Sequence, residues 1–424
     1  MERICILGGR PLAGQIKVSG AKNAALPALA ATLLVEGECT IGNMPRVKDV
    51  YTMVELLKNL GARVELSDGD DNLLIHVDTT SVNNVIVPYD LVKTMRASVL
   101  VLGPLVARFG KANVSLPGGC AIGARPINFH LEGLKRLGAK ITLEEGYVIA
   151  RAEKLSPCTI EFEYPTVTGT ENLMMVAATI QGETLIENAA REPEIIDCAN
   201  ILREMGATIE GAGTGRIMIH GSSSLKPIRH DIISDRIEAG TFMTAAAITR
   251  GKVRIKKCPV KYLSAVIEKL RDIGTQFVDL GDNEIEVIGP DMIKPVDLRT
   301  SPYPGFPTDM QAQLMALLSL SDGVSLITET VFENRFMHIS ELGRMGANIK
   351  IEGHSAIVRG VNQLNGAQVM ATDLRASACL ILAGLAAKRE TIVSRIYHLD
   401  RGYDKIEKKF QDLGAIIRRE REIV

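Results

Sequence analysis

The chain has 424 residues, of which 46% are hydrophobic and 23% charged, and its formal net charge is -1. This composition is typical of a folded globular protein, and the length favours two domains. The small net charge gives no electrostatic footprint for nucleic acid or for an anionic membrane, so neither is an expected partner. No apolar run reaches the length of a membrane span, and residues 1–10 do not predict a signal peptide.

The seven cysteines form no C-x-x-C pair, and an odd number of cysteines cannot all be paired within the chain. Unpaired cysteines favour a reducing compartment. The histidines show neither H-x-x-H nor H-E-x-x-H spacing, so no metal site and no cofactor are expected. These features predict a cytoplasmic enzyme or binding protein.

The phrase L-x-x-L-G-A, or a close variant of it, recurs along the chain, and each copy precedes a β-rich segment. Its glycine suits the left-handed turn that ends a helix. Successive glycines are separated by 77, 68, 68, 72 and 68 residues, which indicates a sixfold repeat of about 70 residues. The six glycines are Gly61, Gly138, Gly206, Gly274, Gly346 and Gly414.

Each repeat also contains an earlier segment that is apolar on nearly all sides. A helix without a polar face must be buried all round, so these segments are predicted to be inner helices. The amphipathic helices that end at the repeated glycines are predicted to lie outside. The predicted inner helices span residues 24–34, 98–107, 173–180, 242–248, 314–320 and 378–387. Six α/β units would form two similar lobes, and the cleft between lobes is the expected ligand site.

Basic residues recur at the starts of the predicted outer helices. A cation at a helix N-terminus opposes the helix macrodipole, so this repeated placement predicts an anion between the basic residue and the helix end. Asp and Asn at the starts of the inner helices are explained by capping. The basic residues are Arg46, Arg125, Arg191, Lys261, Arg335 and Arg401.

The segment 116–126 places Cys120 among three glycines and ahead of Arg125 and Pro126. Glycines allow such a segment to change conformation, and packing alone does not require a thiol in it. A thiol five residues before an arginine at a helix start is a candidate acid, base or nucleophile for an anionic ligand. Most unpaired cysteines are small core residues, so the local pattern leaves both interpretations open.

Several motifs distributed over essentially the whole chain carry a family resemblance. They are G-A-K-N-A at 20–24, the segment 116–126, N-A-A-R-E-P-E at 188–194, F-P-T-D-M-Q-A-Q at 306–313, F-E-N-R-F-M at 332–337, D-L-R-A-S at 373–377 and D-R-G-Y at 400–403. With these motifs the chain resembles the UDP-N-acetylglucosamine enolpyruvyl transferases, also called UDP-N-acetylglucosamine 1-carboxyvinyltransferases. The resemblance implies an α/β fold, a two-domain inside-out α/β barrel built from six βαβαββ-type repeats, three per domain. It implies one lobe at 22–233, a second at 1–21 plus 234–424, and an active site in the interdomain cleft.

The resemblance also implies a reaction. The enolpyruvyl group of phosphoenolpyruvate is transferred to the 3′-hydroxyl of UDP-N-acetylglucosamine, and phosphate is released through a tetrahedral intermediate, in the first committed step of peptidoglycan synthesis. Two alternatives stay open. One is an enolpyruvylshikimate-phosphate synthase, a related enzyme that lacks the thiol loop, and the other is a catalytically silent paralogue that binds the sugar nucleotide. The oligomeric state is left open, and a monomer is compatible with the sequence.

Residue roles follow from the same resemblance. Cys120 would protonate C3 of phosphoenolpyruvate, and Asp309 would take the proton of the 3′-hydroxyl. The implied phosphoenolpyruvate site consists of Lys22, Arg96, Arg125, Arg335, Arg375 and Arg401, with Lys22 and Arg401 also catalytic and Asp373 supporting. The implied sugar-nucleotide contacts are Asn23, Arg96, Arg125, Pro126, Val167, Thr308, Asp309 and Val331. One departure from the family pattern is V-T-G-T at 167–170, where V-G-A-T is expected.

Overall fold

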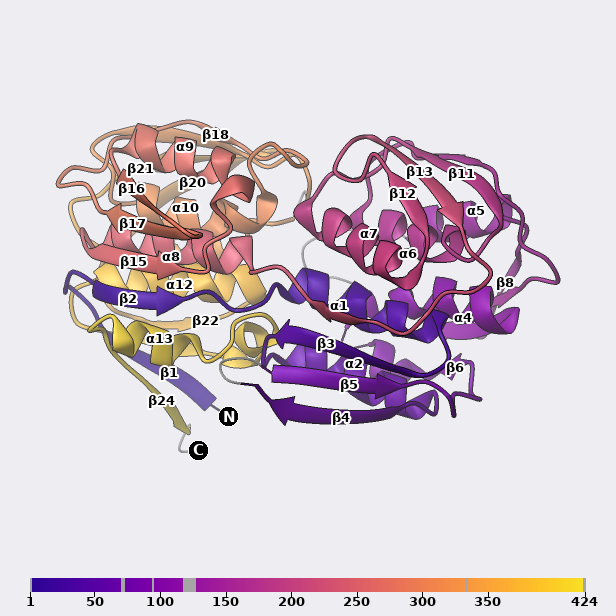
Figure 1. Cartoon of the computed structure of the whole chain (residues 1–424). Helices are drawn as coiled ribbons and strands as arrows, with labels where there is room; N and C mark the ends of the chain where they lie inside the picture. Colours follow the sequence, from indigo (N-terminus) through magenta and orange to yellow (C-terminus); the bar gives the residue numbers. More distant parts are fainter. Residues whose placement is uncertain (1, 70–72, 94, 117–126, 333, 422–424) are drawn as a thin grey trace. The chain divides into compact units, whose positions relative to one another are not determined.

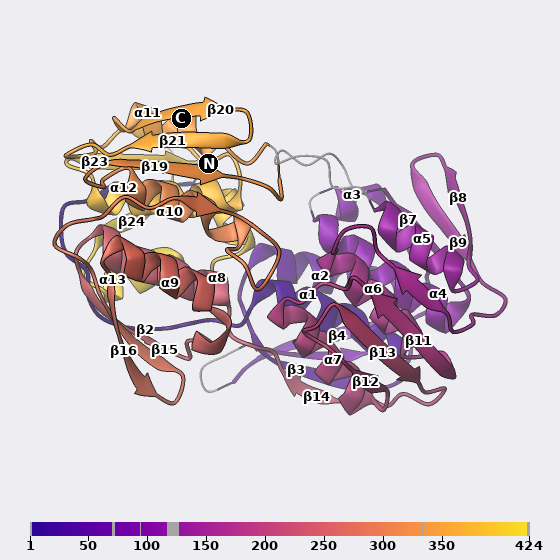
Figure 2. The same ribbon diagram turned by 90° about the horizontal axis from the view of Figure 1, so that it is seen from above.

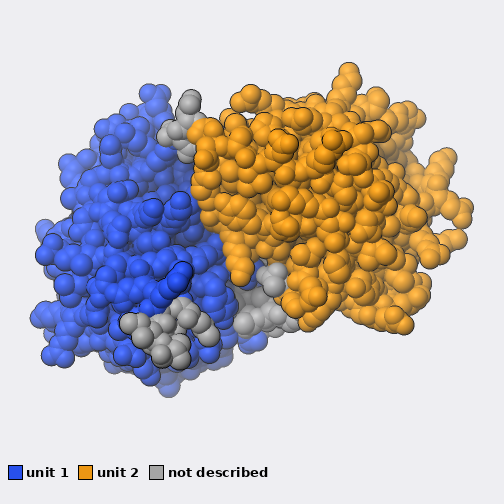
Figure 3. Space-filling model, turned by 90° about the horizontal axis from the view of Figure 1, so that it is seen from below, with its two compact units in different colours: residues 1–19, 120–124, 234–424 blue, residues 20–119, 125–233 orange. Residues whose placement is uncertain are grey.

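The computed structural model describes residues 2–69, 73–93, 95–116, 127–332 and 334–421. These residues form two compact units, which are coloured separately in Figure 3. Unit 1 comprises residues 2–19 and 234–421, and unit 2 comprises residues 20–116 and 127–233. Each unit contains three four-stranded sheets around a set of inner helices (Figures 1 and 2). The predicted α/β class with six repeated units is confirmed.

Unit 2 contains the first three inner helices and their sheets. Its α-helices and 3₁₀ helices (η) are α1 (Lys22–Ala31), η1 (Thr32–Leu34), α2 (Lys48–Asn59), α3 (Tyr89–Val92), η2 (Arg96–Val101), α4 (Leu102–Phe109), α5 (Asn128–Arg136), α6 (Val167–Ala177) and α7 (Pro193–Met205). Its strands are β3 (Glu38–Met44), β4 (Arg63–Asp68), β5 (Leu73–Asp78), β6 (Ile86–Val87), β7 (Lys111–Ser115), β8 (Lys140–Glu144), β9 (Tyr147–Arg151), β10 (Thr159–Glu161), β11 (Gly182–Glu187), β12 (Thr208–Glu210), β13 (Arg216–Gly221) and β14 (Arg229–Asp231). The sheet orders are β14-β3-β5-β4, β6-β7-β9-β8 and β10-β11-β13-β12.

Unit 1 repeats this arrangement. Its helices are α8 (Arg236–Ile248), η3 (Val260–Tyr262), α9 (Ser264–Ile273), η4 (Thr308–Met310), α10 (Gln311–Leu318), α11 (His338–Arg344), α12 (Leu374–Ala386), η5 (Ile396–Arg401) and α13 (Ile406–Asp412). Its strands are β1 (Glu2–Leu7), β2 (Ala13–Lys17), β15 (Lys252–Lys256), β16 (Gln276–Gly281), β17 (Glu284–Ile288), β18 (Leu298–Arg299), β19 (Val324–Thr328), β20 (Asn348–Glu352), β21 (Ser355–Arg359), β22 (Gln368–Met370), β23 (Glu390–Ser394) and β24 (Ile416–Arg421). The sheet orders are β16-β17-β15-β2, β18-β19-β21-β20 and β22-β23-β1-β24.

Every sheet combines one parallel pair of strands with two antiparallel pairs. Strands β2 and β14 each come just before an inner helix, but neither pairs with the strand that comes just after that helix. β2 precedes α1 but pairs with β15, and β14 precedes α8 but pairs with β3. The N-terminal β1 completes the last sheet between β23 and β24. These pairings join segments far apart in the chain, so the repeat spacing could not reveal them.

The predicted inner helices are present and almost completely buried, and α8, α10 and α12 pack against one another inside unit 1 (Figure 2). They begin earlier than the apolar runs predicted. α6 begins at Val167 rather than at residue 173, and α8 begins at Arg236 rather than at 242. The added first turns carry buried polar side chains such as Glu171 and Glu238. An apolar periodicity could not assign these residues to a buried helix.

The six repeated glycines all have positive φ, between +86° and +119°, at or just after the ends of the outer helices. At Gly206 the backbone N–H donates to the carbonyl of Arg203 and closes the last turn of α7. This is the left-handed helix end that the repeat predicts.

Six of the seven cysteines lie in the described part of the chain, and all six are free thiols. Five of them are buried and Cys158 is half-buried, as expected for small core residues. Cys120 lies outside the described residues. None of the described helices combines the length and the apolarity that crossing a membrane requires.

Candidate active site

Asp309 lies between two guanidinium groups in unit 1. It occupies η4, which leads directly into the inner helix α10. Its Oδ1 is 2.7 Å from Nη2 of Arg335, and its Oδ2 accepts a hydrogen bond of 2.8 Å from Nη2 of Arg375. The two arginine side chains are only 7% and 5% exposed, whereas the carboxylate is 25% exposed. One carboxylate therefore faces two buried cations and retains an opening to solvent.

This arrangement fixes the charge of Asp309. Burial alone would raise the pKa of its carboxyl, but the charges and hydrogen bonds of Arg375 and Arg335 outweigh burial and hold the pKa well below its usual range. Asp309 is therefore ionised at neutral pH and is a weak base while both guanidiniums contact it.

A second carboxylate, Glu329, stands behind Arg335. Nη1 of Arg335 donates to Oγ1 of Thr308 at 2.9 Å, and the Thr308 hydroxyl donates to Oε2 of Glu329 at 2.8 Å. The backbone N–H of Val331 donates to Oε1 of the same carboxylate at 2.8 Å. A cavity of about 370 Å³ lies here, lined by Thr328, Glu329, Thr330, Val331 and His354. The predicted residues Thr308 and Val331 are thus connected through Glu329, which the motifs did not single out.

Arg375 is held from the other side by the start of α12 and by Tyr403. Asp373 caps α12, because its Oδ1 accepts a hydrogen bond from the backbone N–H of Arg375 at 2.8 Å. The guanidinium lies 5.6 Å from the centre of the Tyr403 ring, and Nη1 donates to the phenol oxygen at 3.3 Å. That oxygen is also 2.9 Å from Oγ1 of Thr241. Arg375 therefore has a fixed direction toward Asp309.

In unit 2 the predicted residues lie at the starts of three inner helices. Lys22 is the first residue of α1, and its Nζ is 3.2 Å from Oδ2 of Asp49 in the first turn of α2. Both side chains are largely buried, with exposures of 14% and 4%. Asn23 follows Lys22 in α1, and Arg96 begins η2. Asp49, which the sequence did not single out, is placed to fix the ammonium group of Lys22.

The departure at 167–170 has a local structural explanation. Val167 begins α6, and Thr166 caps this helix by accepting the backbone N–H of Gly169 at 3.3 Å. A Cβ atom at Gly169 would lie 2.4 Å from Cγ2 of Thr166. A larger residue at position 169 would collide with the capping threonine, which accounts for the glycine there.

His130 in α5 joins this region to the other inner helices of unit 2. Its Nδ1 is 2.9 Å from Nδ2 of Asn172, and its Nε2 is 3.2 Å from Oγ1 of Thr168. The Asn172 amide donates to Nδ1, so the neutral ring carries its proton on Nε2, toward Thr168. Burial, with a contribution from the charge of Arg96, lowers the pKa of His130 to about 3.

The lowered pKa of His130 predicts a loss of stability in acid. Between about pH 6.5 and pH 3 the unfolded chain binds a proton that the folded chain does not, so the free energy of unfolding falls as the pH falls. We expect this site to contribute a decrease of about 3 kcal/mol between pH 7 and pH 4. Urea unfolding of His130→Asn should show a smaller decrease over this range than the unsubstituted protein. The exposed His220→Asn serves as the control, and an unchanged pH slope in His130→Asn would contradict the assignment.

The structure separates the predicted residues into two sets within the part of the chain that it describes. In unit 1 it brings together Thr308, Asp309, Arg335, Asp373 and Arg375. Val331 is joined to this set through Glu329, and Arg401 ends η5 in the same unit. Unit 2 holds Lys22, Asn23, Arg96 and Val167 at its inner helix starts. Cys120, Arg125 and Pro126 lie outside the described residues.

The repeated basic residues at outer helix starts do not form one common feature. Of these basic residues, Arg335 is the only buried one in the described part of the chain. Arg46 binds the carboxylate of Asp68, and Nζ of Lys261 lies 4.7 Å from the ring centre of Tyr262. For Arg46 and Arg335 the expected anion is thus a carboxylate of the protein itself.

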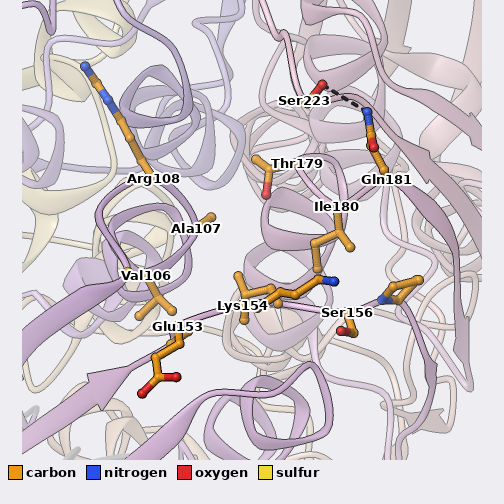
Figure 4. A pocket seen from close by; sticks show the side chains of 14 residues that line it. Val106, Ala107, Arg108, Glu153, Lys154, Ser156, Thr179, Ile180, Gln181 and Ser223 are labelled. Carbon is orange, nitrogen blue, oxygen red and sulfur yellow. Dashed lines mark hydrogen bonds between the residues drawn. The ribbon is translucent and has the colours of Figure 1, made fainter.

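A larger hollow of about 600 Å³ lies in unit 2 and contains none of the predicted residues (Figure 4). Its lining includes Arg108, Lys154, Thr179 and Gln181. Nη1 of Arg108 donates to the carbonyl of Val35 at 2.7 Å, and Nη2 donates to that of Thr79 at 3.2 Å, so this guanidinium holds backbone in place. Within the described ranges, no group of three or more His, Cys, Asp or Glu side chains is arranged to hold a metal ion.

The comparisons with known proteins agree with this fold. Residues 6–410 match the family model of EPSP synthase (3-phosphoshikimate 1-carboxyvinyltransferase). The chain therefore belongs to the EPSP synthase family. It is 58% identical over 422 residues to the UDP-N-acetylglucosamine 1-carboxyvinyltransferase of Geotalea uraniireducens, with 100% of both chains covered. It is 55% identical to the enzyme of the same name from Thermodesulfovibrio yellowstonii, with 99% of this chain and 100% of that one covered.

Two solved structures are similar over nearly the whole chain. The enolpyruvyl transferase NikO from Streptomyces tendae is 28% identical, with a TM-score of 0.88, covering 99% of this chain and 98% of that chain. An EPSP synthase from Acinetobacter baumannii is 17% identical, with a TM-score of 0.76, and covers 99% of this chain and 100% of that chain. The second likeness concerns the fold alone.

Proposed function

We propose that the protein transfers the enolpyruvyl group of phosphoenolpyruvate to the 3′-hydroxyl of UDP-N-acetylglucosamine and releases phosphate. The observation that carries this proposal is the Asp309 carboxylate held between the buried guanidiniums of Arg335 and Arg375. It offers one proton acceptor beside two groups that bind phosphate or carboxylate. Relatives with this activity in their names are 55–58% identical over essentially the full chain.

The proposed reaction consists of an addition and an elimination. In the addition, the 3′-oxygen bonds to C2 of phosphoenolpyruvate, its proton passes to Asp309, and Cys120 gives a proton to C3. The product is a tetrahedral ketal. In the elimination, the Cys120 thiolate takes a proton back from C3, the bond between C2 and the phosphate oxygen breaks, and phosphate departs with the electron pair and with the proton held by Asp309. An acid and a base are both required at neutral pH, because C3 must gain a proton and the 3′-hydroxyl must lose one.

The low pKa of Asp309 has a direct consequence for this mechanism. A weak base takes the hydroxyl proton while the carbon–oxygen bond forms, rather than before it. Substrate anions also compete with Asp309 for the guanidiniums of Arg335 and Arg375. As these arginines turn toward phosphoenolpyruvate, the pKa of Asp309 rises toward its ordinary value and the carboxylate becomes a better base. Binding of phosphoenolpyruvate thus makes Asp309 a stronger base.

The remaining proposed roles concern binding. Lys22, Arg96, Arg125, Arg335, Arg375 and Arg401 neutralise the phosphate and carboxylate of phosphoenolpyruvate, an electrostatic role that also favours departure of phosphate. The proposed contacts with the sugar nucleotide are Asn23, Arg96, Arg125, Pro126, Val167, Thr308, Asp309 and Val331.

The proposed reaction is the first committed step of peptidoglycan synthesis, on which the bacterial cell wall, cell shape and cell division depend. The free thiols of the six described cysteines support a cytoplasmic location.

A phosphate-release assay tests the proposal. Phosphate should appear only when phosphoenolpyruvate and UDP-N-acetylglucosamine are both present, and the product should carry a carboxyvinyl ether at the 3′-position. Release with shikimate 3-phosphate instead would identify the related synthase. Binding of the sugar nucleotide without any phosphate release would identify a catalytically silent protein.

Arg375→Lys should weaken use of phosphoenolpyruvate. Arg375 contacts Asp309 through one nitrogen and Tyr403 through another, and a lysine ammonium cannot occupy both positions. We expect the KM for phosphoenolpyruvate to rise about 10- to 100-fold, the loss typical of a charged hydrogen bond. Arg344→Lys, at a side chain that is 58% exposed, is the matched control. A KM equal to that of the control would remove Arg375 from the proposed binding site.

A further inference from the structure

Glu329 is a buried carboxylate with an unusually complete set of donors. It lies just after β19 and is 1% exposed. Its Oε1 accepts from Oγ1 of Thr300 at 2.7 Å, from the N–H of Val331 at 2.8 Å and from the N–H of Phe332 at 3.1 Å. Its Oε2 accepts from Oγ1 of Thr308 at 2.8 Å. A carboxylate is costly to bury, and four donors offset that cost.

The bond to Thr308 has a consequence beyond the fold. A hydroxyl has one proton, and Thr308 gives it to Glu329. Its oxygen is then left with lone pairs only, which is the state required to accept from Nη1 of Arg335 at 2.9 Å. The same guanidinium reaches Asp309 through Nη2 at 2.7 Å. Glu329, Thr308, Arg335 and Asp309 therefore form one ordered chain of donors and acceptors.

Glu329 also turns the backbone of the segment that follows it. The N–H groups of Val331 and Phe332 both point to Oε1, so the position of Val331 depends on this carboxylate. One side chain thus orients two of the proposed sugar-nucleotide contacts, the Thr308 hydroxyl and Val331, together with one of the two cations on Asp309.

From this geometry we propose that Glu329 is a positioning residue of the active site, which fixes the Thr308 hydroxyl as an acceptor and thereby aligns Arg335 with Asp309. The inference rests on the proposed function, since Thr308 and Val331 are taken to contact UDP-N-acetylglucosamine. Glu329 itself acts through Thr308 and needs no contact with the reacting atoms.

Glu329→Gln tests the link selectively. The glutamine oxygen should take the Oε1 position, where three donors converge, and this leaves the NH₂ group facing Thr308. The Thr308 hydroxyl then loses its acceptor, and the amide competes with Arg335 for its oxygen. We expect the KM for UDP-N-acetylglucosamine to rise about tenfold. The control is Glu352→Gln, at an exposed carboxylate of β20 in the sheet that contains β19, and its kinetics are expected to be unchanged.

A double-mutant cycle with Thr308→Val separates positioning from a merely structural role. If Glu329 acts through the Thr308 hydroxyl, adding Glu329→Gln to Thr308→Val should change kcat/KM by less than about twofold. The inference would be overturned if the losses of kcat/KM in the two single variants multiplied in full in the double variant. It would also be overturned if the KM of Glu329→Gln lay within about twofold of the unsubstituted value. If the unsubstituted protein released no phosphate, the proposed function would fail on its own. The same cycle would then be measured on the Kd of UDP-N-acetylglucosamine by calorimetry, with the same two criteria.

Thermal unfolding shows whether Glu329→Gln is folded. Should it not fold, Thr300→Val takes its place, because it keeps the shape of the buried side chain and removes one donor to Glu329. This variant leaves the charge of Glu329 in place and loosens its position. A smaller rise in the KM for UDP-N-acetylglucosamine, in the same direction, is expected, and an unchanged KM would count against the inference.

Discussion

Asp309→Asn is expected to lower kcat about 10²- to 10⁴-fold, the range over which a positioned acid or base contributes. The amide keeps the size of the side chain and cannot accept the proton of the 3′-hydroxyl. Initial rates of phosphate release at saturating concentrations of both substrates measure this effect. Asp322→Asn, an exposed position in the same unit, is the matched control. A kcat within about tenfold of the control would leave Asp309 without the role of base.

The same substitution should change stability, because it leaves two buried guanidiniums around a neutral side chain. We expect the free energy of unfolding to fall by about 3 kcal/mol, at the low end for a broken buried ion pair. The amide oxygen still accepts from one arginine, and the site is partly open to solvent, which limits the loss. Inorganic phosphate should restore part of the stability by binding the freed arginines. Denaturant unfolding with and without phosphate measures both effects, and equal stability of Asp309→Asn and Asp322→Asn would contradict the expectation.

Cys120→Ser is expected to lower kcat about 10²- to 10⁴-fold as well. A serine hydroxyl is a far weaker acid than a thiol, whose ordinary pKa is about 8.5, so it should not protonate C3 at a useful rate. Because the change is small in size, the KM for UDP-N-acetylglucosamine should change much less than kcat. Steady-state phosphate release with each substrate varied in turn measures both quantities.

Cys158→Ser provides the comparison for the thiol, since Cys158 is a free, half-buried cysteine outside the predicted site. It should retain the kinetics of the unsubstituted protein. Loss of activity in both serine variants, or in neither, would show that Cys120 is not a specific proton donor.

Much of the architecture could be predicted from periodicity. The spacing of Gly61, Gly138 and their four counterparts gave the number of repeats, and the positive φ of each glycine shows why that residue recurs. The apolar segments located the inner helices but not their beginnings. The first turns of α6 and α8 contain buried polar residues, so the apolar pattern ended too early there.

The candidate site was predictable only where a residue belongs to a recognised motif. Asp309, Arg335 and Arg375 were identified in this way, and the structure brings them together. Glu329 and Asp49 were missed. Each supports another side chain from a different segment, and a lone acidic residue in a sequence gives no sign of the partner that it meets after folding.

The sequence by itself determined the sixfold repeat and the placement of buried and outer helices, because these depend on local spacing and residue type. Its motifs carried the family resemblance that implies which residues serve as acid, base and anion binders. Tertiary structure decided which of those residues meet. It placed β2 beside β15 and β14 beside β3, and it set Asp309 between two guanidiniums while Glu329 fixed one of them through Thr308. The pKa of Asp309 and the direction of each hydrogen bond depend on atoms within a few ångströms of one another, and only the folded chain brings those atoms together.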